Sequence, residues 1–221
     1  MAVLLSGMGH DVTVLTGKPN YPQGTFYDGY HGGGISREHL GDVLVVRIPM
    51  MARGYSRIGL ALNYLSFILS ASLLGPWALR GQKVDIVFVY GISPLLQALP
   101  AVLLAKLRRI PLVVWVQDLW PDSLTATGHV RNRMILRVVS ALVRLIYRSS
   151  DRILVQSRAF IEPVAKYAEV EKIHYYPNPY LEKRSTQVSE KVARLASDIG
   201  QQFSVVFAGN LGTGSGAGHH R

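Results

Sequence analysis

The sequence lacks cysteine, and acidic residues are few. Without cysteine the chain can form neither disulfide bonds nor thiolate metal sites, which suits a reducing cytosol. Charged residues make up only 17% of the chain, against roughly 25% in an average domain. Because 24 lysines and arginines outnumber 14 aspartates and glutamates, the formal net charge is +10. This excess of positive charge suggests nucleic acid, an anionic membrane surface or phosphorylated substrates as partners.

Two signals that would define a location or a cofactor are also absent. Residues 2–5 are too short for the hydrophobic region of a signal peptide, and no basic start precedes them. The glycines at 32–34 lack the G-x-G-x-x-G spacing of a dinucleotide site. They lie in a segment at 17–34 that is rich in Gly, Pro and Tyr, which we expect to be a surface loop.

Short β-branched runs alternate with helical patterns along the chain. Runs typical of strands occur at 11–15, 43–48, 85–89, 112–116, 152–155 and 173–176. After the strand at 85–89, Ser93 is expected to cap a helix, with Pro94 in its first turn and Arg108 near its end. Parallel strands joined by helical crossovers predict an α/β fold, with a Rossmann-like parallel sheet and flanking helices.

The strand at 112–116 ends in a candidate site. Gln117 and Asp118 follow it directly, and the chain then turns through Trp120 and Pro121. In an open α/β sheet, ligands bind outside the carboxyl ends of the strands, so Asp118 is a candidate catalytic carboxylate. The turn at 90–93 should lie beside it at the same edge of the sheet. The alternative is that Asp118 merely caps the turn before Pro121.

The stretch 58–79 contains no charged residue and is flanked by Arg57 and Arg80. Its length is sufficient to span a bilayer. Small or polar residues nevertheless recur in it at helical spacing and form one stripe: Gly59, Asn63, Ser66 and Ser70. The Gly-Pro pair at 75–76 is expected to end the helix. We therefore favour a helix packed on the α/β domain over a transmembrane span.

The segment 131–148 predicts an amphipathic helix without an acidic residue. Four basic side chains fall within an arc of about 60° on a helical wheel, and we name them the arginine row: Arg133, Arg137, Arg144 and Arg148. The opposite face is apolar: Ile135, Val138, Val139, Leu142 and Ile146. Solvated helices usually mix charges of both signs, so an unbroken arginine row favours contact with phosphate or anionic lipid headgroups.

Both ends of the sequence suggest a chain cut from a longer one. Residues 1–6 look like the last turn of a helix before a strand, which implies an earlier strand. Residues 181–200 are polar and helical, and an apolar strand at 203–208 leads into a glycine-containing loop. We therefore predict an incomplete Rossmann-like domain at 1–180, a linker at 181–202, and the first strand and loop of a truncated second domain with a low-complexity tail at 203–221.

Six sequence runs occur in an order that resembles one enzyme family. They are G-H-D-V-T-V-L-T-G, D-I-V-F-V-Y, V-Q-D-L-W-P-D-S, D-R-I-L-V-Q-S, Y-Y-P-N-P and F-A-G-N-L-G. Together they resemble bacterial family 4 glycosyltransferases, whose GT-B architecture has two Rossmann-like domains facing a cleft. The third run is similar to the branch that builds O-antigen, capsule and colanic-acid-type polysaccharides, including fucosamine transferases. The resemblance covers residues 7–213.

This resemblance implies roles for particular residues. The N-terminal domain would receive the acceptor, and the C-terminal domain would bind a nucleotide-sugar, expected to be UDP-linked. Many relatives carry a His-Asp pair where this chain has Gln117 and Asp118, so Asp118 is carried over as the catalytic residue. The acceptor-side candidates are Gln117, Trp120, Tyr90 and Ser93. The donor-binding candidates are Gly209, Asn210 and Gly212, where glycine lets backbone N–H groups approach an anion.

The implied enzyme is a retaining glycosyltransferase that uses no metal ion and no cofactor besides its nucleotide-sugar substrate. Its acceptor would be lipid-linked or a growing glycan, and the arginine row would dock it on the inner face of the cell membrane as a peripheral cytoplasmic protein. The chain alone is expected to be inactive. Alternatives are a non-catalytic membrane-binding module and a nucleotide-sugar 2-epimerase of the same fold. Nucleic-acid binding is not favoured, because no reader motif occurs.

Overall fold

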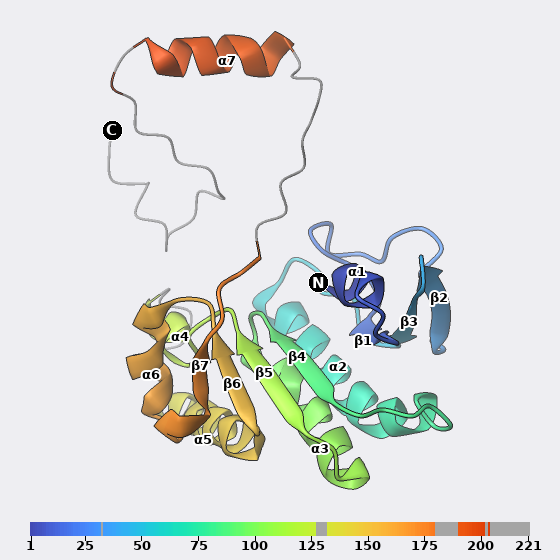
Figure 1. The fold of residues 1–221 in the computed structure, drawn as a ribbon. Helices are drawn as coiled ribbons and strands as arrows, with labels where there is room; N and C mark the ends of the chain where they lie inside the picture. Colours follow the sequence, from blue (N-terminus) through green and yellow to red (C-terminus); the bar gives the residue numbers. More distant parts are fainter. Residues whose placement is uncertain (32, 127–131, 180–189, 202, 204–221) are drawn as a thin grey trace.

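The computed structural model describes residues 1–31, 33–126, 132–179, 190–201 and 203. Four strands form a parallel sheet in the order β4-β5-β6-β7 (Figure 1): β4 (Val87–Gly91), β5 (Leu112–Val116), β6 (Arg152–Val155) and β7 (Ile173–Tyr175). Helices α3 (Leu99–Arg108) and α5 (Arg133–Ser149) pack against it. A parallel sheet with flanking helices confirms the predicted α/β fold class.

Three further strands form a second sheet in the order β1-β3-β2: β1 (Thr13–Gly17), β3 (Val43–Ile48) and β2 (Ser36–Leu40). β1 runs parallel to β3, whereas β2 runs antiparallel to it. Within the described residues, β1 pairs only with β3 and β4 only with β5, so the strands fall into two sheets. β2 escaped prediction because its residues are mostly polar and lie at a sheet edge, where no apolar alternation is required.

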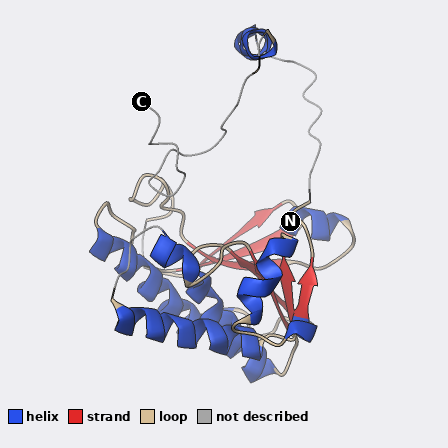
Figure 2. Cartoon of the chain, turned by 90° about the vertical axis from the view of Figure 1, so that its left-hand side faces the viewer, coloured by secondary structure: helices blue, strands red, loops and turns tan. Residues whose placement is uncertain are grey.

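The remaining elements are short, and several differ from the predicted ranges. Helix α1 (Ala2–Gly7) precedes β1 as predicted, while α4 (Asp122–Ala126) was not predicted. Residues 158–165 form the 3₁₀ turn η2 (Arg158–Phe160) and the short helix α6 (Ile161–Ala165). The chain turns after α6, where the N–H of Tyr167 donates to the carbonyl of Val164. η3 (Val170–Lys172) follows, and α7 (Glu190–Gly200) lies apart from both sheets (Figures 1 and 2).

The main core lies between the four-stranded sheet and its helices. Every second residue of β5 and β6 enters it, including Val114, Val116 and Ile153, because side chains alternate between the two faces of a strand. Val143 and Ile146 of α5 meet them from the helical side, and both are completely buried. β5 is therefore held against α5 through this face, and the residues that follow it leave the sheet at a defined point.

Helix α2 (Arg57–Ala78) connects the two sheets by packing against β1, β3 and α3. Its inner residues Ala71 and Ala78 share a second core with Val46 and Ile48 of β3. The prediction that the Gly-Pro pair ends this helix is wrong, because Pro76 lies inside it. Pro76 deprives the helix of one i→i−4 hydrogen bond, but burial of Ala78 holds the last turn on the core.

Candidate functional site

The carboxyl ends of β4, β5 and β6 meet at one edge of the four-stranded sheet. The ladder continues one residue beyond β5, where the N–H of Gln117 donates to the carbonyl of Gly91 at 3.0 Å. Gly91 must be small: a Cβ at this position would lie 2.9 Å from the carbonyl oxygen of Trp115. The two chains therefore run close together, and the segments after β4 and β5 lie side by side as predicted.

Asp118 and Trp120 form a fixed unit at this edge. The indole Nε1–H of Trp120 is shared by two acceptors, Asp118 Oδ2 and Ser93 Oγ, each at 3.1 Å. Asp118 is half-buried and Trp120 is buried. The prediction that Ser93 caps the next helix is wrong, because no side chain caps the 3₁₀ turn η1 (Leu95–Ala98) that precedes α3. Ser93 instead joins the turn after β4 to the segment after β5.

A second set of hydrogen bonds links Gln117 to the neighbouring strand ends. Gln156 Nε2 donates to the carbonyl of Gln117 at 2.9 Å, and Asn178 Nδ2 donates to Gln156 Oε1 at 2.6 Å. Sequence reasoning missed Gln156 and Asn178 as site residues. A signal existed for Gln156, which follows the buried strand β6 just as Gln117 follows β5. The side-chain amide nitrogen of Gln117 is buried without a partner among the described residues.

Tyr147 of α5 lies beneath this edge. Its side chain is almost completely buried, and its hydroxyl has no hydrogen-bond partner within the described residues. Burial raises the pKa of Tyr147 far above its usual value, and the negative charge of Asp118 adds to the rise. The phenol is therefore protonated at physiological pH, and no acceptor for its O–H is present among the described residues.

Tyr90, the remaining acceptor-side candidate, makes no hydrogen bond to the other three within the described residues and packs instead against Trp115. Its ring packs edge-on against Trp115, with ring centroids 5.4 Å apart. The ring of Tyr176 contacts the same indole, whose Nε1–H donates to the carbonyl of Tyr176 at 3.0 Å. The structure thus joins Ser93, Trp120 and Asp118, places Gln117 next to them, and gives Tyr90 a packing contact with Trp115.

The arginine row lies on α5, and all four of its side chains are exposed. The predicted apolar face of this helix needs one correction: Val139 and Ile146 are buried, but Ile135 and Val138 are exposed. Val143 and Tyr147, both fully buried, turn the packed face away from Val138. The outward half of α5 therefore carries the arginine row beside an apolar strip.

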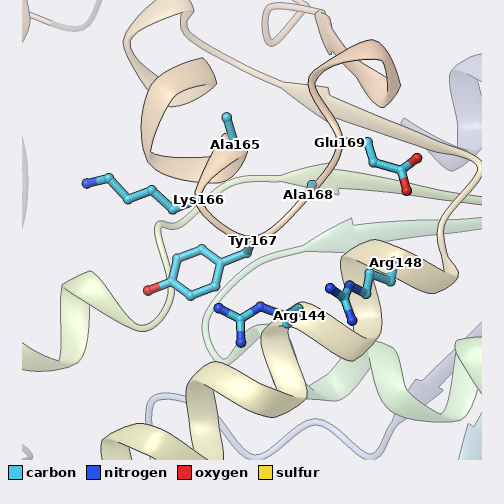
Figure 3. A pocket seen from close by; sticks show the side chains of 7 residues that line it. All are labelled: Arg144, Arg148, Ala165, Lys166, Tyr167, Ala168 and Glu169. Carbon is cyan, nitrogen blue, oxygen red and sulfur yellow. The ribbon is translucent and has the colours of Figure 1, made fainter.

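An open hollow of about 230 Å³ lies between α5 and the segment that follows α6 (Figure 3). Three of its seven lining residues are basic, and the full lining is Arg144, Arg148, Ala165, Lys166, Tyr167, Ala168 and Glu169. The guanidinium of Arg144 lies 5.7 Å from the ring centre of Tyr167. The carboxylate of Glu169 pairs with Lys172 Nζ at 3.3 Å, and Lys172 is not part of the lining. The negative charge of Glu169 is therefore offset, and the three cationic side chains set the charge of the hollow. An anion of phosphate size matches this chemistry.

Two predicted features lie at the limits of the structure. The donor-binding candidates Gly209, Asn210 and Gly212 are outside the described residues. Within the described part of the chain, no group of three His, Asp or Glu side chains is placed to hold a metal ion. The expected absence of a metal therefore stays a prediction. What the described edge does offer is a half-buried carboxylate, with amide and hydroxyl groups around it.

Comparison with known proteins gives the class of this chain. Residues 1–179 match the glycosyl transferase 4-like domain, and the chain belongs to that family. It is 28% identical over 184 residues to the putative colanic acid biosynthesis glycosyl transferase WcaI of Escherichia coli K12, covering 80% of this chain and 44% of WcaI. The chain therefore spans less than half the length of this curated relative.

Among solved structures, the chain is similar to the α,α-trehalose 6-phosphate synthase from Burkholderia multivorans. The match has 13% sequence identity and a TM-score of 0.46, and it covers 86% of this chain and 55% of that protein. The family membership and the similarity to WcaI confirm the resemblance to polysaccharide-building glycosyltransferases.

Proposed function

We propose that this chain is the acceptor-side part of a glycosyltransferase that moves a sugar from a nucleotide-sugar, UDP-linked, to a lipid-linked or growing polysaccharide acceptor. The reaction takes place at the cytoplasmic face of the cell membrane and retains the anomeric configuration. One observation carries the proposal: Asp118 stands at the carboxyl end of a central parallel strand with its carboxylate held in position by Trp120. Ligands bind at this edge of α/β sheets.

In the proposed reaction Asp118 accepts a hydrogen bond from the acceptor hydroxyl. Its Oδ2 atom is engaged by the Trp120 indole, which leaves Oδ1 to face the acceptor. As the hydroxyl oxygen bonds to the anomeric carbon, the bond from that carbon to the diphosphate breaks. The diphosphate leaves with the electron pair of that bond and takes up the hydroxyl proton. Asp118 orients the oxygen and stabilises its growing positive charge.

The unpartnered amide nitrogen of Gln117 supports the same proposal. A buried amide without a partner is costly unless a ligand or water satisfies it. It can donate to a ring oxygen or hydroxyl of a sugar. Gln117 stands where many family members have histidine, and its amide does not titrate. We therefore expect the rate to lack a titration from this position near neutral pH.

The experiment is a product analysis with the full-length protein. It is incubated with UDP- and GDP-sugars and an undecaprenyl-diphosphate-linked saccharide, and products are separated by mass and examined by NMR. The proposal predicts a glycoside with the anomeric configuration of the donor. Release of a free epimerised sugar nucleotide identifies an epimerase instead. Failure to form a glycoside from any donor, by protein that binds vesicles and is folded, indicates a non-catalytic membrane module.

A further inference from the structure

Helix α2 exposes an apolar stripe that the sequence did not place on the surface. We call it the outer α2 face: Ile58, Leu62, Leu65, Leu69 and Leu73. These positions recur every three or four residues, so their side chains fall within an arc of about 80°. Leu69 is 62% exposed and Leu73 is 76% exposed. Within the described residues, α2 is also the one helix long and apolar enough to cross a membrane.

The polar residues of α2 point inward or sideways, the reverse of a helix built to face water. Asn63 is buried, and its Nδ2 donates to the carbonyl of Met51 at 2.6 Å and to Asn20 Oδ1 at 3.3 Å. Ser66 Oγ accepts from the N–H of Met51 at 2.9 Å. Asn63 and Ser66 thus lie on the side of α2 that packs against the protein, and the leucines of the outer α2 face are exposed. A contiguous exposed apolar surface of this kind marks an interaction site.

The surroundings of the outer α2 face are basic and aromatic. At its C-terminal end the Arg80 guanidinium lies 4.7 Å from the ring centre of Trp77, and both side chains are exposed. Tryptophan and arginine together are typical of the boundary between headgroups and acyl chains. α3 lies between α2 and α5, and it exposes Leu103 and Leu107. Figure 2 shows these helices gathered on one side of the strands.

We propose that the outer α2 face docks on an anionic lipid bilayer, with the helix lying along the membrane surface and its leucines in the acyl boundary. Charge complementarity selects this occupant, because the exposed Arg80 stands just beyond the C-terminal end of α2 in a chain of formal charge +10. A spanning orientation would strip Ala71 and Ala78 from the core they share with β3. The inference rests on the proposed function, since it explains how the enzyme meets a lipid-linked acceptor.

Trp77 is a natural reporter of this docking. Of the three tryptophans in the sequence, Trp77 is 52% exposed, whereas Trp115 is 1% and Trp120 is 9% exposed. The full chain is mixed with vesicles of phosphatidylcholine and phosphatidylglycerol whose acyl chains carry bromine. The proposal predicts a blue shift and quenching of the tryptophan emission. Trp77→Phe should remove the quenching while the protein still co-sediments with the vesicles.

A double substitution tests the leucines themselves. Leu69→Asp with Leu73→Asp should weaken vesicle binding roughly hundredfold, because two apolar insertions are lost. Leu40→Asp is the matched control: Leu40 is 60% exposed but lies on β2 and not on the outer α2 face, so the variant should bind as wild type does. Far-UV circular dichroism and urea midpoints confirm that each variant is folded. Equal binding by wild type and the folded double variant would overturn the proposal.

The absence of cysteine allows a depth profile along the helix. Single variants Ile58→Cys, Leu65→Cys and Leu73→Cys are labelled with an environment-sensitive fluorophore, and quenchers at known acyl depths report the position of each label. A helix along the surface gives three similar, shallow depths. A depth that is greatest at Leu65 and shallow at both ends would show a spanning helix and contradict the proposal.

Light scattering in lipid-free buffer tests a second copy of the chain as the occupant. A dimer that dissociates in the double variant, together with unquenched Trp77 on brominated vesicles, would overturn membrane docking. None of these readouts depends on sugar transfer. Quenching without any glycoside product would defeat the proposed function and leave the docking intact, whereas transfer without quenching would defeat the docking alone.

Discussion

Trp120 fixes the position of Asp118 by donating its indole N–H to Oδ2 of that carboxylate at 3.1 Å. The same N–H reaches Ser93 Oγ, so one buried ring ties the end of β5 to the turn after β4. An aspartate held by a rigid aromatic donor loses little further freedom when a substrate arrives. These hydrogen bonds fit the turn-organising role that the sequence left open for Asp118, whereas its catalytic role stays a prediction.

Gly91 should tolerate no side chain. In Gly91→Ala the new Cβ would lie 2.9 Å from the Trp115 carbonyl oxygen and 3.2 Å from Leu95 Cδ1. We expect a loss of about 1–3 kcal/mol in the free energy of unfolding, measured by urea denaturation. Gly7→Ala is the control, because nothing lies within 4 Å of that position. A Gly91→Ala variant as stable as the control would show that β4 and β5 separate more readily than their contacts indicate.

The hydroxyl of Tyr147 should contribute nothing to stability. It is buried and unpartnered within the described residues, so Tyr147→Phe removes an unsatisfied group and keeps the ring. We expect the free energy of unfolding to stay the same or to rise by up to about 1 kcal/mol. Tyr147→Ala, which empties the ring's volume, should cost about 3–5 kcal/mol. A clear loss in the phenylalanine variant would reveal a hydrogen-bond partner for the hydroxyl.

Glu38 should make the stability of the β2-β3 pair depend on pH. The Arg47 Nε–H donates to Glu38 Oε1 at 2.7 Å and the Tyr30 hydroxyl donates to Oε2 at 2.9 Å, and these bonds lower the pKa of Glu38 from 4.5. A carboxyl with a depressed folded-state pKa stabilises the fold above its unfolded pKa and ceases to do so as the pH falls through the folded value.

Glu38→Gln should therefore be less stable than wild type at neutral pH, and the gap should close as the pH falls below 4.5. Urea midpoints of both proteins across the acid range measure this difference in stability. Tyr30→Phe, which removes the weaker of the two bonds to Glu38, should show the same pattern with a smaller gap. A gap that stays constant with pH would mean that the carboxylate is not the stabilising form.

The arginine row should govern the salt-sensitive part of membrane binding. Replacing Arg133, Arg137 and Arg144 with Glu should release the protein from anionic vesicles, since each basic residue near the surface contributes about 1 kcal/mol. Vesicle co-sedimentation measures this, and neutral phosphatidylcholine vesicles, on which the variant and wild type should behave alike, are the control. Unchanged binding to anionic vesicles would show that α5 is not part of the docking surface.

The sequence predicted the buried strands well because their signal is local. β3, β5 and β6 have the predicted bounds, since each is a short β-branched run surrounded by core. β2 was missed because the contacts that define it, its backbone ladder with β3 and the ion pair of Glu38 with Arg47, join it to another strand. An edge strand with polar residues carries too little periodicity to be recognised.

The site was predictable in position but not in its contacts. Asp118 follows a recognisable strand, whereas the Trp120 contact with Ser93 joins residues far apart in sequence. From the sequence alone, Ser93 was therefore predicted to cap the helix that follows it, because that helix is close to it in the chain. α2 shows the same limit: its composition gave the helix, but only its packing against Met51 and Asn20 decides which side faces out.

The proposed sugar transfer depends on the negative charge of Asp118. In the full-length protein, Asp118→Asn keeps an oxygen that can accept from the Trp120 indole and removes only the negative charge. Asp122→Asn, at an exposed position on α4, is the matched control and should transfer sugar at the wild-type rate. Initial rates of glycoside formation are measured beside thermal midpoints. We expect the rate to fall at least about 100-fold for Asp118→Asn with an unchanged midpoint. A wild-type rate would rule out the catalytic role and leave Asp118 as a partner of Trp120 alone.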